Sequence, residues 1–204
     1  MKQKAGILIL IISVMWMLHT FSKNFMVDPQ FEKFISKKDQ ILTDYNLWVS
    51  MIRIHILLAI ISLITGPLGV IKAIRDKSRN FHRWNGRIYV LSIILNFIPG
   101  VYVSFFATGG LPSIIGFLIL NTLWLTTTIL GFWYIIRQKV MLHSQWIIRS
   151  FFLSFANITI YIIVAISHNL MNFSYVHSYT IAVWLCWPLN LIVAEFVIRR
   201  KLLF

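Results

Sequence analysis

The chain has 204 residues, of which 58% are hydrophobic and only 12% are charged. A soluble domain carries about a quarter charged residues, so this composition excludes an ordinary water-facing surface. The formal net charge of +13 would suit a nucleic-acid-binding protein if it were gathered on one face. Most basic residues instead stand in short segments between apolar runs, where they act as orientation signals in a membrane. We therefore predict membrane lipids as partners, and no nucleic acid.

Six apolar runs are each long enough to cross the hydrocarbon core as a helix, which takes roughly 20 residues. They are continuous rather than alternating, which argues against a barrel. The predicted spans are Ala5–Phe21, Trp48–Ile71, Ile88–Ala107, Leu111–Ile136, Trp146–Ser167 and Tyr179–Ile198. We expect an all-α, multi-pass membrane bundle of about six helices.

The predicted organisation is one transmembrane domain over residues 1–204. Its parts are a first helix (1–21), an outer loop (22–47), a five-helix region (48–198) and a basic tail (199–204). In the loop, Phe31, Phe34 and Ile35 are spaced for one face of a short interfacial helix. An ordinary polar connection fits the loop equally well.

The Lys and Arg residues in the flanks predict the orientation. Fourteen of the nineteen lie on the side of the two termini, Lys2, Lys4 and Lys72 among them, and five lie on the side of the outer loop. The positive-inside rule then places both termini in the cytoplasm and the protein in the cell membrane.

Polar residues recur within the spans at helical spacing. Such residues are costly in lipid unless they face the bundle interior. Span two carries His55, Ala59, Ser62, Gly66 and Gly69. Span three, extended into the preceding cytoplasmic loop, carries His82, Gly86, Tyr89, Asn96 and Gly100. Span five carries His143, Ser150, Ser154, Asn157, Tyr161 and His168. Each stripe predicts a face that packs on other helices or on a flat cofactor.

Four of these histidines fall into two layers. His55 and His168 belong to the outer layer, and His82 and His143 belong to the cytoplasmic layer. If span five is one straight helix, His143 and His168 share a face about 37 Å apart at 1.5 Å per residue. Imidazoles from different helices can ligate haem iron from opposite faces. The alternative is that these histidines are interfacial residues that meet headgroups or cap helices.

Glu195 is the one acid that we place inside a span, near its cytoplasmic end. We expect an ion pair with Arg149 or Arg87 at the same depth, with a proton-relay role as the alternative. The single cysteine, Cys186, excludes an intrachain disulfide and any site built from several thiolates. Phosphate-loop, nucleophile-elbow and zinc-protease motifs are missing from the sequence.

Several segments together resemble a known family. The specific ones are His82-Arg83-x-x-Gly86-Arg87-x-Tyr89 and His143-x-x-Trp146-x-x-Arg149-Ser150. They are accompanied by His55 with Gly66-Pro67, and by Trp184-x-Cys186-Trp187-x-x-Asn190-Leu191-x-x-Ala194-Glu195. The arrangement resembles the predicted bacterial membrane proteins of domain-of-unknown-function family 2306, over roughly residues 48–198. The family name implies no activity.

The histidine-bearing helices also resemble the four-helix core of transmembrane two-haem cytochrome b reductases, at the level of the fold. That resemblance implies a ligand from each of four helices, but Leu111–Ile136 contains no histidine. The outer layer would have to recruit His168. Two haems, a single haem between His82 and His143, and no haem therefore all remain open.

Our leading hypothesis is a b-type haem protein that moves electrons in the membrane. His82 and His143 are its first ligand pair, and His55 and His168 come next. Arg83, Arg87 and Arg149 would hold haem propionates or lipid headgroups. A quinone or a protein redox partner is expected, and oxidoreductase activity is left open. The alternatives are a small-molecule transporter or binding protein, and a structural or assembly protein without a cofactor.

Overall fold

The chain is almost entirely helical in the computed structural model, which describes residues 2–39 and 42–203. The side chains of residues 2–4, 72 and 73 lie outside that description, so the predicted orientation signals at Lys2, Lys4 and Lys72 do too. The helices are α1 (Lys2–Phe21), its π-helical continuation η1 (Ser22–Val27), α2 (Glu32–Ile35), α3 (Tyr45–Val70), α4 (Lys72–Lys77), α5 (Arg79–Ser104), α6 (Gly110–Ile136), α7 (Val140–Leu153), α8 (Ala156–Asn169) and α9 (Tyr175–Arg199). The predicted all-helical class is confirmed.

Five spans in the described part of the chain are long and apolar enough to cross a membrane: α1 with η1, α3, α5, α6 and α9. The bent pair of α7 and α8 meets the same criteria as a sixth. The prediction of about six transmembrane helices is therefore confirmed. Helix α5 begins well before the predicted Ile88, because the Ser78 hydroxyl caps it by accepting a hydrogen bond from the Phe81 amide at 3.2 Å.

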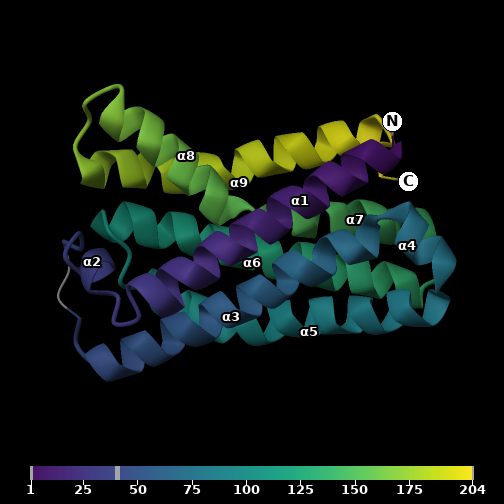
Figure 1. Ribbon diagram of the computed structural model, residues 1–204, viewed down its shortest axis with the longest axis horizontal. Coiled ribbons are helices and arrows are strands. Elements are labelled where there is room, and N and C mark those ends of the chain that lie inside the picture. Colours follow the sequence, from purple (N-terminus) through teal and green to yellow (C-terminus); the bar gives the residue numbers. More distant parts are fainter. Residues whose placement is uncertain (1, 40–41, 204) are drawn as a thin grey trace.

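The long helices run side by side between two ends of the molecule (Figure 1). Helix α2 and its flanking loops lie at one end, called here the loop end. Both chain termini and α4 lie at the other, the terminal end. Exposed apolar side chains such as Ile98, Leu111 and Ile192 cover the flanks of the bundle. Such flanks fit a hydrocarbon surrounding rather than water.

Helices α3, α5, α6 and α7 form a four-helix ring. Helix α3 packs on α5, α5 on α6, α6 on α7, and α7 back on α3. Helices α5 and α7 therefore stand on opposite sides of the ring. Outside it, α9 packs on α6 and α7, and α1 packs on α3.

Small residues allow the ring helices to approach one another closely. A Cβ added at Gly66 on α3 would lie 2.3 Å from the ring of Phe151 on α7, whose side chain is fully buried. A Cβ at Gly131 on α6 would lie 2.6 Å from Ile147, also on α7. Glycine at these positions thus sets the α3–α7 and α6–α7 spacing, as small residues commonly do between membrane helices.

The predicted span Trp146–Ser167 is not one straight helix, so the condition under which His143 and His168 would share a face does not hold. Helix α7 ends at Leu153, α8 begins at Ala156, and their axes differ by 42°. The Ser154 hydroxyl donates to the Phe151 carbonyl at 2.6 Å, and such back-bonding by serine bends helices. Helix α8 consequently leaves the ring and packs along α9 (Figure 1).

The loop between η1 and α3 contains one short helix, and its aromatic side chains turn onto the bundle. Helix α2 has only four residues. The rings of Phe31 and Phe34 each lie 5.8 Å from the Trp48 ring on α3, and Phe31 is 1% exposed. The aromatic residues that predicted a lipid-facing helix instead cover the first turn of α3.

Candidate functional site

Two histidines lie at the terminal end of the four-helix ring. His82 lies in the first turn of α5 and His143 in the first turn of α7, on opposite sides of the ring. The charge of His143 acts on His82. The Ser78 cap positions the start of α5, and a left-handed residue, Gln138 (φ 58°), turns the chain into α7. The structure thus brings together the cytoplasmic layer predicted from the sequence.

The orientation of the His143 ring is fixed by a backbone carbonyl. Its Nδ1 lies 2.8 Å from the Gly131 carbonyl oxygen on α6. A carbonyl can only accept, so Nδ1 donates its proton, and Nε2 of the neutral ring keeps its lone pair. Metal-ligating histidines are usually held in this way.

Among the residues whose side chains the structure describes, none is hydrogen-bonded to the Nδ1 of His82. This nitrogen is buried, although the residue as a whole is only partly so. An unpartnered buried nitrogen is costly in a low-dielectric surrounding. It is therefore the atom at this end of the ring that would gain most from a ligand or a water molecule.

A cation that we did not single out as a site residue completes the cluster. Arg75 on α4 is close enough to act electrostatically on both His82 and His143. Its Nε lies 3.8 Å from the carboxylate of Asp76. In the sequence Arg75 is one of several basic residues in a loop, and only the packing of α4 beside α3 and α5 distinguishes it.

The predicted anion-binding arginines lie elsewhere. Arg83 and Arg87 are exposed, and the Arg87 guanidinium lies 5.0 Å from the Trp84 ring. Arg149 donates through Nε to Glu195 at 2.5 Å and lies 4.6 Å from the Trp146 ring. The predicted pair between Arg149 and Glu195 thus forms, joining α7 to α9.

Glu195 is less enclosed than the sequence suggested. Its side chain is 39% exposed, and that of Arg149 is 20% exposed. The pair therefore lies on the flank of the bundle rather than inside it.

The predicted outer layer is not assembled. His55 on α3 faces the amide of Asn96 on α5, inside the ring. His168 is exposed in the last turn of α8, and its Nδ1 lies 2.8 Å from the Phe173 carbonyl oxygen in the following loop. Because α8 bends away to pack on α9, the two histidines have different neighbours.

Between the two ends, the ring encloses a buried network of hydroxyl groups. The Ser150 Oγ on α7 lies 2.7 Å from the Tyr89 hydroxyl on α5 and 2.6 Å from Thr128 Oγ1 on α6. All three residues are buried. One turn nearer the terminal end, Asn85 donates to the Thr65 carbonyl at 2.7 Å.

The loop half of the ring contains polar atoms without partners. The Asn96 side chain is 1% exposed, and neither its nitrogen nor its oxygen has a hydrogen-bond partner, nor does the buried Nδ1 of His55. Gly100 leaves room for these side chains, since a Cβ there would lie 3.3 Å from His55 Nδ1 and 2.6 Å from Asn121 Oδ1. Asn121 itself donates to Ser104 Oγ at 3.1 Å. We call His55, Asn96 and Asn121 the amide cluster.

The described residues contain no group of three or more His, Cys, Asp or Glu side chains that could hold a metal ion. The terminal-end cluster thus offers two imidazoles and one guanidinium.

Comparisons with known proteins give one match. Neither the curated proteins nor the solved structures contain a significant match to this chain. The family described as "Predicted membrane protein (DUF2306)" matches residues 52–198. That stretch runs from the first third of α3 to the end of α9, and it includes both histidines of the terminal-end cluster. The chain therefore belongs to the DUF2306 family of predicted membrane proteins.

Proposed function

We propose that this membrane protein binds one haem b between His82 and His143 and passes electrons within the cytoplasmic membrane. The observation that carries the proposal is the placement of two histidines at one end of opposite ring helices, one with its Nε2 left free because the Gly131 carbonyl binds its Nδ1. Haem iron in b-type cytochromes takes axial imidazoles, and its reversible one-electron chemistry is what the cofactor would supply.

The residues at this end of the ring fit such a group. Among the described residues, the buried Nδ1 of His82 has no hydrogen-bond partner and is open to one. Arg75 lies near both histidines and suits a propionate, because a guanidinium pairs well with a carboxylate. Arg75 thus replaces Arg83, Arg87 and Arg149 as the candidate for that role. His55 and His168 are left out, so the proposal is one haem and not two.

Absorption spectra test the proposal directly. The protein would be purified in mild detergent from haem-supplied cells, and spectra recorded in air and after dithionite. We expect a Soret band with sharp bands in the reduced spectrum, and one haem per chain by the pyridine haemochrome assay. His82→Ala and His143→Ala should each abolish these bands.

A matched control is His177→Ala. His177 is hydrogen-bonded to the Ser174 hydroxyl at the loop end, so its replacement should leave the spectrum unchanged. A colourless wild-type protein that elutes as a single monodisperse species would refute the proposal.

A second candidate function has its own observation. The unpartnered atoms of the amide cluster suit a small neutral ligand that both donates and accepts hydrogen bonds. This supports the small-molecule binding or transport alternative. It predicts ligand-dependent thermal stabilisation that Asn96→Leu removes, in a protein without haem bands.

The structural alternative has the Ser150 network in its favour, since interhelical hydroxyl bonds hold membrane helices together. It predicts that wild type has no visible absorption bands. His82→Ala and His143→Ala should then change thermal stability but not the spectrum.

A further inference from the structure

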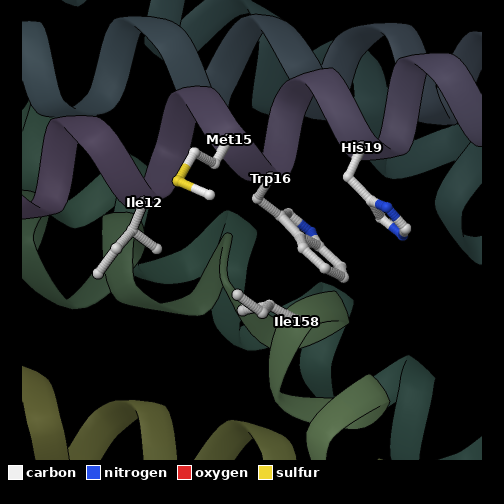
Figure 2. A pocket seen from close by; sticks show the side chains of 5 residues that line it. All are labelled: Ile12, Met15, Trp16, His19 and Ile158. Carbon is white, nitrogen blue, oxygen red and sulfur yellow. The ribbon is translucent and has the colours of Figure 1, made fainter.

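A lateral recess opens between α1 and α8, outside the four-helix ring. It has a volume of about 310 Å³ and is lined by Ile12, Met15, Trp16 and His19 of α1 and by Ile158 of α8. Figure 2 shows the four α1 side chains projecting from one face of the helix, with Ile158 opposite. The recess exists because the bend after α7 carries α8 away from the ring while α1 stays on α3.

The loop end of this recess is aromatic and cationic. The Trp16 ring stacks on His19 at 4.9 Å and meets the Tyr161 ring of α8 edge-on at 5.3 Å. Lys23 donates a hydrogen bond to the Tyr161 hydroxyl, and its ammonium lies 4.6 Å from that ring. Tryptophan, tyrosine and lysine are the residues that mark headgroup level at a membrane surface.

The order of side chains along α1 matches the order of groups in a lipid. Going toward the loop end, the recess passes from Ile12 and Met15 to Trp16 and His19, and Lys23 follows one turn later. From residue 12 to residue 23 the rise is roughly 16 Å at 1.5 Å per residue, about half of the ~30 Å hydrocarbon core. That is the depth of one leaflet.

The charge at the top of the recess indicates which lipid fits. An ammonium has three donors, and within the described residues Tyr161 is the one hydrogen-bond partner of Lys23. Three carboxylates of the loop accept from backbone amides and not from Lys23: Asp28 from residues 32 and 33, Asp39 from Gly109, and Asp44 from Leu47. An anionic phospholipid, whose headgroup has no amine to balance the phosphate, would therefore complement the charge of Lys23 better than a zwitterionic phospholipid would.

We propose that the recess holds one acyl chain of an anionic phospholipid from the leaflet at the loop end, with the lipid phosphate on Lys23. The lipid fills the wedge left by the bend and ties α1 to α8. This proposal is independent of haem binding, because the two sites share no residue.

Native mass spectrometry of the delipidated protein tests it, with phosphatidylglycerol and phosphatidylcholine of the same chains. Wild type should retain one phosphatidylglycerol about fivefold more tightly than phosphatidylcholine, as expected for one lysine near a phosphate. Lys23→Gln should make the two lipids equal. Ile158→Trp, which fills the recess, should abolish the tight adduct with either lipid.

Ile98→Trp is the matched control. Ile98 lies on the lipid-facing side of α5 and is 73% exposed, so the same substitution there should leave the adduct intact. If Ile158→Trp misfolds, Met15→Trp takes its place in the experiment, because it fills the recess from the α1 side. Equal binding of the two lipids by wild type, an adduct that survives both fillings, or a dimer formed through α1 in place of lipid would each overturn the proposal.

Discussion

At the scale of single residues, the clearest electrostatic feature outside the membrane spans is Lys38 in the loop. Its ammonium donates to the Phe106 carbonyl and lies 5.1 Å from the Trp48 ring and 5.2 Å from the Phe34 ring. Burial lowers the pKa of Lys38 to about 8, while the neighbouring Asp39 carboxylate acts in the opposite direction. The folded protein therefore releases this proton more readily than the unfolded chain does.

This difference predicts a pH dependence of stability. Between about pH 8 and the ordinary lysine pKa of about 10.4, the unfolded chain binds more protons at Lys38, so stability should rise with pH. We expect the thermal midpoint of wild type to rise relative to that of Lys38→Met over this window. Lys33→Met, at an exposed lysine of the same loop, should give a flat difference. A flat difference for Lys38→Met as well would show that the Lys38 pKa is normal.

At the scale of the elements, the ring helices are joined by side chains at their contacts. Ser150 connects three of them, because α5 reaches it through Tyr89 and α6 through Thr128. The Thr128 hydroxyl also donates a hydrogen bond to the Trp124 carbonyl at 2.7 Å. The Tyr89 hydroxyl is hydrogen-bonded to Ser150 Oγ. Loss of the serine hydroxyl should therefore affect Tyr89 more than Thr128.

A double-mutant cycle measures this coupling. We expect Ser150→Ala to lower the free energy of unfolding by about 1 kcal/mol, as interhelical hydrogen bonds in membranes commonly do. Tyr89→Phe should cost less in the Ser150→Ala background than in wild type. The measurement is equilibrium unfolding in mixed micelles. Additive costs would show that the two hydroxyls do not interact.

At the scale of the whole molecule, both termini lie at one end of the bundle, as an even number of crossings requires (Figure 1). Which end faces the cytoplasm rests on the distribution of basic residues. The family match begins inside α3, so α1 and the loop lie outside the matched residues. The proposed lipid site therefore joins a helix of the family region to one outside it.

Cysteine accessibility tests the predicted orientation. In a Cys186→Ala background, Ser36→Cys at the loop end should react with a membrane-impermeant maleimide in intact spheroplasts. Asn80→Cys at the terminal end should react only after permeabilisation. Both positions are exposed, and Cys186 is fully buried. The reverse labelling pattern would place the termini outside.

The sequence by itself determined the fold class and the approximate spans, and it narrowed the partner of Glu195 to Arg149 or Arg87. Apolar runs of membrane-spanning length have few alternatives to helices, and a carboxylate at that depth needs a nearby cation. It also placed His82 and His143 in one layer, because the height of each along its own span follows from helical rise alone.

Only the tertiary structure decided the rest. The bend at Ser154 depends on local back-bonding, which spacing does not reveal, and it separates His168 from His55 and opens the recess beside α1. Arg75 lies near the two histidines because α4 packs beside α3 and α5. Asn96 lies beside His55 because Gly100, which has no side chain, leaves space between the helices. Sequence periodicity fixes a residue's height and face on its own helix, but the partner across the interface depends on how the helices pack.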